Sequence, residues 1–367
     1  MKYLKSYVHF MWMLVALTPA YVNAKEITFG TYMPGTHQST MNTVKFGEAL
    51  ANHTDGDLTL SVLSGGSIAS GKATLSVISD GLIDAGLVTD VYVPGDFPHT
   101  VIASSLALRG ESPWVMAGAM AEYAMTDCNG CREDLDKLGV LNLGHHSTGT
   151  YMLLCNAKIS SVADLKGKKI KAAGPWTRLV ASWGAAPVNI PFNDVYEGLQ
   201  RGQLDCALAP ESAIEDYGLY DVLSHVVDFP MGTYHGYHSF VFNKDAWESL
   251  TEEQRAFVLK EIPSFVAENI AGYFDSSRKS KAKAIEKGIK YVEVSDDIRE
   301  SFEKAKIEEK EIALTNAAKR GVKNPEENVN TFLKAVDKWT AIIGDDEPSA
   351  AEFSRMLIDE VYSKAQF

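Results

Sequence analysis

Residues 159–211 carry strand and helix signals that interlock without gaps, and they constrain the fold more than any other stretch. A glycine-terminated helical turn at 164–167 precedes an alternating strand at 168–172. Pro175 then opens a helix, and a second strand and helix lead to a buried strand at 204–208. The order strand, helix, strand, helix, strand predicts an α/β fold with a mostly parallel sheet. Ligands of such sheets bind at the carboxyl ends of the strands.

Lys171 lies at the end of the first of these strands, close to the helix that Pro175 opens. Free backbone N–H groups, the positive end of the helix dipole and a fixed cation together form an anion site, most naturally for a carboxylate. The spacing also fits a solvated lysine at a strand end, because three of the four residues 168–171 are lysines.

The motifs of this stretch resemble a known family. DLKGKKIK, a Gly-Pro turn and IPFNDVYEGLQRGQLD before a strand ending in Ala-Pro are similar to the DctP-type periplasmic solute-binding proteins of tripartite ATP-independent (TRAP) transporters. The resemblance extends more weakly over residues 27–288. It implies a two-lobed, type II-like periplasmic binding protein with a central cleft and a long helix spanning both lobes. The implied function is capture of a small organic acid and its delivery to a membrane permease.

The resemblance also implies roles for individual residues. Lys171 stands where the family usually has an arginine that binds the ligand carboxylate. A lysine lacks the planar guanidinium with which arginine binds a carboxylate through two hydrogen bonds. Phe192 stands where an aromatic ring covers the ligand, and Trp176 is a second candidate for this cover. Arg178 could supply this bidentate contact with the carboxylate, or it could lie on the surface of an amphipathic helix.

Four further residues complete the expected wall of the site. Tyr32 ends the first strand, and Asp90 falls where relatives often place an acidic residue. Tyr151 replaces the second arginine of many dicarboxylate binders, and His235 lies on the segment that returns to the first lobe. Each of three residues also has a purely structural interpretation: Tyr32 as part of the core, Asp90 as a helix cap and His235 as a loop cap. One lysine with several aromatic residues favours a monocarboxylate with an apolar or aromatic portion.

Two similar segments, residues 81–87 and 202–208, each end a helix and enter a strand, which indicates two lobes of like topology. A capping box at Thr251 begins a helical pattern that continues to about Gly288. At ~1.5 Å per residue this helix would be about 50 Å long, so it must back both lobes. The expected boundaries are residues 25–145 with 236–262 for the first lobe, 146–235 with 263–320 for the second, and 321–367 for helices packed on the outside.

The N-terminal residues 1–24 have the features of a secretory signal peptide: two lysines, an apolar core at 10–17 and small residues before the expected cleavage after Ala24. A membrane anchor would need roughly 20 apolar residues, and Pro19 interrupts the run. We therefore expect export to the periplasm.

The formal net charge of −13 over 367 residues makes nucleic acid and anionic membrane surfaces poor partners. We expect a monomer that needs no cofactor. Because the chain has neither a G-x-S-x-G nor an H-E-x-x-H motif, we expect no enzymatic activity. A binding protein for an ATP-driven transporter or a sensor, and less so a periplasmic enzyme, remain alternatives.

The four cysteines form two kinds of site. Cys128 and Cys131 have the CxxC spacing, which in an oxidising compartment predicts a small-loop disulfide; a thiol oxidoreductase is the alternative. Cys155 and Cys206 lie in apolar strand runs, where buried free cysteines are usual, and their pairing stays open. The adjacent His145 and His146 point apart and lack a partner at ligand spacing, so we expect no metal there.

Overall fold

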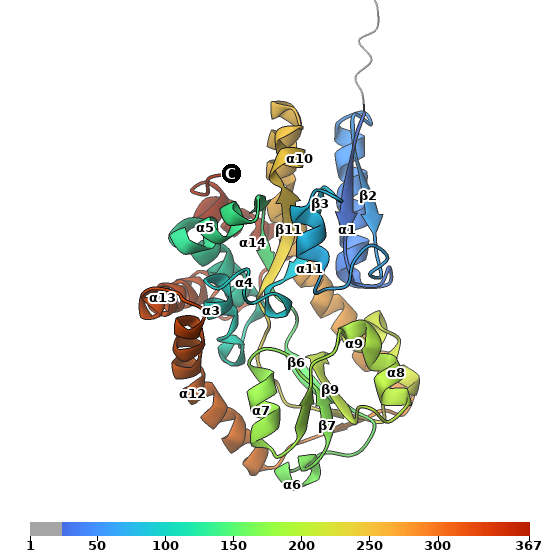
Figure 1. The fold of residues 1–367 in the computed structure, drawn as a ribbon. Coiled ribbons are helices and arrows are strands. Elements are labelled where there is room, and N and C mark those ends of the chain that lie inside the picture. The colour runs from blue at the N-terminus through green and yellow to red at the C-terminus, as the bar shows by residue number, and fades with distance from the viewer. Residues whose placement is uncertain (1–23) are drawn as a thin grey trace, which may run out of the picture.

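The computed structural model describes residues 24–367, which form two lobes, each built on a six-stranded sheet (Figure 1). The predicted signal peptide lies almost entirely outside the described residues. The first sheet contains β1 (Lys25–Gly30), β2 (Leu58–Leu63), β3 (Ala85–Thr89), β4 (Val140–Asn142), β5 (His145–His146) and β11 (Tyr237–Asn243). The second contains β6 (Tyr151–Cys155), β7 (Lys169–Lys171), β8 (Ala186–Val188), β9 (Cys206–Pro210), β10 (His225–Val227) and β12 (Lys290–Val292).

Helices cover both sheets. Those of the first lobe are α1 (Gln38–His53), α2 (Thr74–Ser79), η1 (Asp90–Tyr92), α3 (Thr100–Ser104), η2 (Ala107–Arg109), α4 (Pro113–Glu122), η3 (Tyr123–Asp127), α5 (Asn129–Lys137) and α10 (Lys244–Glu248). Those of the second lobe are α6 (Val162–Leu165), α7 (Trp176–Ser182), η4 (Phe192–Asp194), α8 (Val195–Gln200), α9 (Ala213–Asp216) and η5 (Leu219–Asp221). The chain ends with α11 (Glu252–Glu286), α12 (Asp296–Lys319), α13 (Pro325–Ile343), α14 (Ala350–Leu357) and η6 (Ile358–Tyr362).

The two sheets share one arrangement, which confirms the predicted like topology. The first has the order β2-β1-β3-β11 and the second the order β8-β7-β9-β6. In each, three parallel strands are followed by an antiparallel one. The carboxyl ends of the parallel strands therefore meet at one edge of each sheet, where loops for ligand binding are expected.

An aspartate explains why the two segments at 81–87 and 202–208 are similar. Asp84 accepts hydrogen bonds from the backbone N–H and the hydroxyl of Thr28 in β1, at 2.8 and 2.7 Å. Asp205 accepts the backbone N–H of Lys169 in β7 at 2.7 Å. Each carboxylate thus ties the strand after a helix to the central strand of its own lobe.

The long helix α11 contacts α1 and β5 of the first lobe and α9 and β12 of the second. Its N-terminus has the capping box predicted at Thr251, with Gln254 as the reciprocal partner. A second helix, α12, contacts α3 in the first lobe and α7 in the second, and it runs along one side of both in Figure 1. Two helices therefore tie the lobes together in addition to the chain crossings.

The C-terminal helices pack on the first lobe. Helix α13 lies against α4, where a Cβ at Gly118 would come within 2.3 Å of the Trp339 ring. Helix α14 packs on α11 and buries Phe353. Within residues 24–367, no helix combines the length and apolar character needed to cross a membrane.

The sequence left the pairing of Cys155 and Cys206 open, and the structure joins them in a disulfide. The two residues lie directly opposite each other on the neighbouring strands β6 and β9. They are separated by 51 residues in the sequence. The pairing depends on which strands become neighbours and in which register, and neither is visible in the apolar pattern of each strand.

Candidate functional site

A small cavity of about 40 Å³ lies between the lobes, where residues after the carboxyl ends of β1, β3, β7 and β9 converge. The first lobe lines it with Tyr32, His37, Tyr92 and Tyr237, and α11 adds Tyr273. The second lobe lines it with Tyr151, Lys171, Phe192, Pro210, Ser212, Ala213, Asp216 and Tyr217. Both halves of the molecule therefore enclose one site, and the predicted residues Tyr32, Tyr151, Lys171 and Phe192 meet there.

Lys171 is the cation of this cavity. It is the last residue of β7, and only 4% of its surface is exposed. Its ammonium lies 5.1 Å from the centre of the Phe192 ring and forms no hydrogen bond or ion pair with any described residue. Burial lowers the pKa of Lys171 to about 8, so the side chain is still mostly charged at neutral pH. A buried cation without a counter-ion is costly, and an anionic ligand would relieve that cost.

Helix α7 does not take part in this anion site. None of its residues lines the cavity, so the expected contribution of its N-terminal amides and dipole is absent. Trp176 instead supports the wall from behind: its ring stacks on Tyr151 at 4.1 Å between centroids. Its indole N–H donates to the carbonyl of Met231 at 2.7 Å.

Arg178 does not reach the cleft. It is half-buried and lines a separate cavity of about 160 Å³ between α7 and α12, with Asn316 and Arg320. Burial lowers its pKa, and Glu309 and Glu308 oppose this shift. The guanidinium therefore cannot replace the family's clamping arginine in this arrangement, because it lines a different cavity.

Asp90 also lies outside the cavity lining. It is fully buried, and its Oδ1 accepts a hydrogen bond from the Tyr234 hydroxyl at 2.6 Å. Burial raises the pKa of Asp90 to about 7. The backbone of Gly236 packs against this carboxylate, so close that a Cβ there would lie 2.3 Å from Oδ1. The cavity residue from this turn is Tyr92, two positions further along the chain.

His235 is a structural residue and not part of the cavity wall. Its Nδ1 and Nε2 lie 3.1 and 3.0 Å from the carbonyl oxygens of Thr233 and Ala103. Its ring stacks on Phe332 of α13. Burial lowers the pKa of His235 to about 4, so the ring is neutral. Tyr237, two residues later, provides the wall instead.

The cavity residues that were missed from the sequence include His37 and Asp216. Asp216 Oδ1 accepts a hydrogen bond from Ser276 at 2.8 Å, whereas Oδ2 has no hydrogen-bond partner among the described residues. His37 Nδ1 accepts the backbone N–H of Ser39, so the neutral ring carries its proton on Nε2, 3.7 Å from Asp216 Oδ2. Burial raises the pKa of Asp216 to about 7 and lowers that of His37 to about 3.

A positional signal for both residues exists in the sequence. His37 lies in the loop after the first strand, and Asp216 follows the strand that ends in Ala-Pro. Loops at the carboxyl ends of parallel strands are pocket positions. Neither residue stands out within its loop, because the fold alone determines which loop residue faces inward.

The tyrosines of the cavity are neutral hydroxyls. Burial raises the pKa values of Tyr32, Tyr151, Tyr217 and Tyr237 well above the usual range. The Tyr32 hydroxyl lies 2.7 Å from Thr89 Oγ1. The site thus presents aromatic faces and uncharged hydroxyls around one lysine and one aspartate.

Direct hydrogen bonds join the lobes beside the cavity. Asn193 of η4 donates from Nδ2 to the carbonyl of Tyr32 at 2.8 Å. Thr36 donates from its hydroxyl to the carbonyl of Asp216 at 2.9 Å. Both bonds cross from one lobe to the other, so the structure is that of a closed cleft.

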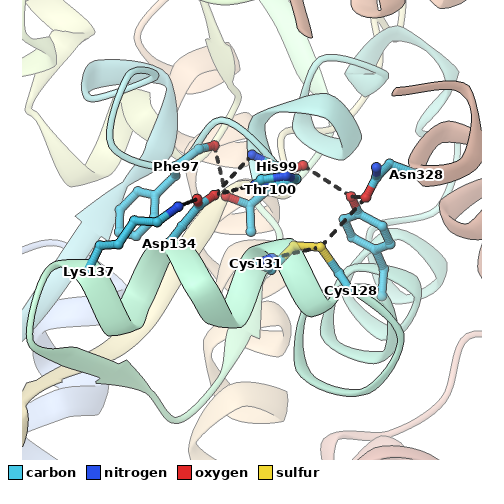
Figure 2. A network of polar contacts seen from close by, with 9 residues as sticks. Phe97, His99, Thr100, Cys128, Cys131, Asp134, Lys137 and Asn328 are labelled. Atoms are coloured by element: carbon cyan, nitrogen blue, oxygen red, sulfur yellow. Dashed lines mark hydrogen bonds and ion pairs between the residues drawn. A yellow bond between two sulfur atoms is a disulfide. The ribbon is translucent and has the colours of Figure 1, made fainter. Parts of the chain in front are cut away.

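The CxxC motif forms a disulfide between Cys128 and Cys131 at the start of α5 (Figure 2), and neither cysteine lines the cleft. Both cysteines are buried. His99 Nδ1 lies 2.8 Å from Asp134 Oδ2 on the same helix, and Figure 2 shows this pair beside the disulfide. The arrangement holds α5 against the loop that precedes α3.

The paired histidines are bound to protein groups. His145 Nε2 lies 2.9 Å from Asn142 Nδ2, and His146 Nδ1 lies 2.8 Å from Ser239 Oγ. Over residues 24–367, no group of three or more His, Cys, Asp or Glu residues is arranged to hold a metal ion.

The chain matches a known protein family over most of its length. The family model described as bacterial extracellular solute-binding protein, family 7 (DctP), matches residues 29–311. The chain is 28% identical over 186 residues to the ectoine-binding periplasmic protein TeaA of Halomonas elongata. That alignment covers 48% of this chain and 53% of TeaA, so the chain matches about half the length of this curated relative.

Solved structures match over nearly their full length. A TRAP periplasmic solute-binding protein of Bordetella bronchiseptica with bound (R)- and (S)-mandelate has a TM-score of 0.74 at 22% identity, covering 86% of this chain and 99% of that chain. A TRAP solute-binding protein of Rhodoferax ferrireducens with copurified benzoate has a TM-score of 0.76 at 17% identity, with coverages of 87% and 100%.

Proposed function

Because the chain belongs to family 7 of the bacterial extracellular solute-binding proteins, the DctP family, we propose that it captures a small carboxylate between its two lobes and delivers it to a TRAP-type permease. The buried ammonium of Lys171 is the observation that carries this proposal. It lies in a cavity that both lobes line, and it has no counter-ion among the described residues. A ligand carboxylate supplies that counter-ion.

The aromatic residues of the cavity suit the remainder of such a ligand. Phe192 lies beside Lys171 and packs on Tyr217, with 4.6 Å between ring centroids. Tyr151 is held in place by Trp176. Mandelate and benzoate, the ligands of two structural relatives, each combine one carboxylate with an aromatic ring. These relatives support a monocarboxylate as the ligand class.

Lobe closure would control access to the site. Asn193 and Thr36 donate hydrogen bonds across the cleft, and these bonds break when the lobes separate. The crossing segments 146–151 and 231–237 pair through backbone bonds, including Tyr151 N–H to Gly232 C=O at 2.8 Å. The lobes therefore hinge about a paired connection, and ligand contacts stabilise the closed state over the open one.

The family and the N-terminal sequence support a periplasmic setting for this function. Residues 1–24 direct export, and the mature protein acts as a monomer in the periplasm. Its acidic surface is then available to the membrane subunits of the permease and not to nucleic acid.

Isothermal titration against benzoate, mandelate, succinate and ectoine tests the proposal, with Lys171→Met as the key variant. We expect at least one monocarboxylate to bind and Lys171→Met to weaken it by about 30-fold or more, since removing a buried charged partner costs at least about 2 kcal/mol. Lys169→Met is the matched control, because Lys169 lies two residues earlier on the same strand and is exposed. The proposal fails if no carboxylate binds, or if both lysine variants bind the carboxylate like the wild type.

A further inference from the structure

Two opposite charges face the interlobe cavity. Lys171 ends β7, and Asp216 lies in α9, which follows β9; these two strands are parallel neighbours in the second sheet. The side chains form no ion pair with each other. Lys171 has no polar partner among the described residues, and Asp216 Oδ2 has none within hydrogen-bond distance. The cavity therefore contains one ammonium group and one carboxylate oxygen, and neither has a hydrogen-bond partner among the described residues.

A purely anionic ligand would satisfy only half of this site. Its carboxylate would pair with Lys171 and leave Asp216 Oδ2 buried beside the ligand without a donor. An unpaired buried acceptor costs about 1–3 kcal/mol, and more when it is charged. The Ser212 hydroxyl and the Gln38 backbone partly offset the burial of this carboxylate, and His37 Nε2 lies 3.7 Å from Oδ2, beyond hydrogen-bond distance. A ligand that carries a positively charged nitrogen would satisfy the carboxylate as well.

The aromatic surroundings of Asp216 favour a cation at the same place. Tyr217 is its chain neighbour, and the rings of Tyr217 and Tyr273 both lie 5.7 Å from the ring of His37, whose Nε2 is 3.7 Å from Asp216 Oδ2. The faces of aromatic rings attract ammonium and amidinium groups, most strongly where water is excluded. Because burial raises the pKa of Tyr217 and Tyr273, both rings keep their hydroxyl protons.

We propose that the ligand is a compact zwitterion whose carboxylate binds Lys171 and whose positively charged nitrogen binds Asp216 among the tyrosines. This inference rests on the proposed function and narrows its ligand class. The cavity volume of about 40 Å³ sets the size of the ligand. A cavity needs about 10–15 Å³ for one water molecule, so this enclosed space corresponds to a few waters and favours a compact ligand.

Pairs of ligands that differ only at the nitrogen provide the test on the wild-type protein. L-proline is compared with cyclopentanecarboxylate, and glycine betaine with 3,3-dimethylbutanoate, in which a carbon replaces the charged nitrogen. By isothermal titration we expect the zwitterion to bind at least ten-fold more tightly in one pair or both. If the carboxylates bind as tightly as the zwitterions, or more tightly, the zwitterion proposal is overturned while the carboxylate-binding function stands. If none of the four ligands, nor any acid of the wider panel, binds, the proposed function fails as well.

Asp216→Asn isolates the second charge. We expect this variant to lose about 10- to 100-fold in affinity for the zwitterion, the range for a hydrogen bond to a charged group. Its affinity for the matching carboxylate should stay the same or rise. Asp221→Asn, on the exposed η5 turn outside the cavity, is the control and should change neither. Equal weakening of both ligand classes by Asp216→Asn would overturn the proposal, and the wild-type ligand pairs decide the question if the variant does not fold.

Proton release gives an independent readout. At pH 6.5 Asp216 is partly protonated in the free protein, because burial raises its pKa to about 7. The other cavity groups do not titrate there, since burial holds His37 neutral and Lys171 is charged below about pH 8. Binding of a zwitterion should release a proton, seen as a binding enthalpy that differs between phosphate and Bis-Tris buffers. Zwitterion binding without this buffer dependence would contradict the assignment of the nitrogen to Asp216.

Discussion

At the scale of single residues, burial sets the chemistry of the site. Lys171 and Lys169 lie on the same short strand, yet only Lys171 points into the protein. Burial makes its ammonium an unpaired cation with a pKa of about 8, whereas Lys169 donates to the carbonyl of Gly202 at the surface. Because side chains two residues apart leave a strand on the same face, the difference comes from what covers each position and not from the pleat.

The shifted pKa of Lys171 predicts how carboxylate binding depends on pH. Above about pH 8 the free protein loses the Lys171 proton, so affinity should fall about ten-fold per pH unit. The neighbouring groups stay unchanged in this range: Asp216 is ionised, His37 is neutral, and burial keeps the tyrosines protonated. Titrations between pH 8 and 10 measure the effect. Lys171→Arg should remove the decline, because arginine stays charged; an unchanged decline would show that another group titrates.

The same shift affects stability with a definite sign. The folded protein releases the Lys171 proton near pH 8, whereas the unfolded chain holds it until about pH 10.4. Between these values the unfolded state binds more protons, so this residue makes the free energy of unfolding rise with pH. The buried charge therefore destabilises the unliganded protein at neutral pH, which is a cost of keeping the site ready for an anion.

At the scale of elements, each lobe contains the same turn between a helix and a strand. Asp84 and Asp205 each follow a glycine-terminated helix and accept the backbone N–H of the central strand. The glycines at the turns, Gly81 and Gly202, adopt positive φ angles of 69° and 65°. A residue with a Cβ would be strained in that conformation, so the turn and the aspartate together account for the repeated pattern.

The two disulfides belong to the same scale and should differ in effect. Cys155–Cys206 closes a separation of 51 residues and Cys128–Cys131 one of 3. Loop-closure entropy predicts that removing the long-range bond costs about 4 kcal/mol and the short one about 2. Urea unfolding of the double variants Cys155→Ala/Cys206→Ala and Cys128→Ala/Cys131→Ala measures both. An equal or larger loss for the short loop would contradict the entropic account.

At the scale of the whole molecule, the site exists only when the lobes meet. Tyr32 and Tyr237 come from the first lobe, whereas Lys171 and Asp216 come from the second. Helix α11 contributes Tyr273 and contacts both lobes. Closure therefore assembles the cavity and excludes water from its charges in one step, which strengthens each electrostatic contact.

Weakening the contacts between the lobes should shift the molecule toward the open state. Asn193→Ala removes the hydrogen bond to Tyr32 and should lower ligand affinity about 2- to 10-fold, mainly through faster dissociation. Small-angle scattering of the ligand-free variant should show a larger radius of gyration. Asn156→Ala is the control, because Asn156 bonds to Leu204 within the second lobe. An effect of equal size in both variants would show that closure is not involved.

The sequence by itself determined the α/β class, the repeated topology of the lobes, the long helix and the cavity position of Tyr32, Tyr151, Lys171 and Phe192. These features follow from local patterns and from a resemblance whose motifs stand in a fixed order. Only the tertiary structure decided three other features. These are the burial of Lys171 by a lobe, the pairing of Cys155, and the inward orientation of Asp216 and His37. Asp90, Arg178 and His235 have the side chains of a binding site, yet packing turns them toward Tyr234, α12 and Phe332. The reason is that a local pattern defines which face of an element is apolar, whereas the contacts of a side chain depend on elements far away in the chain.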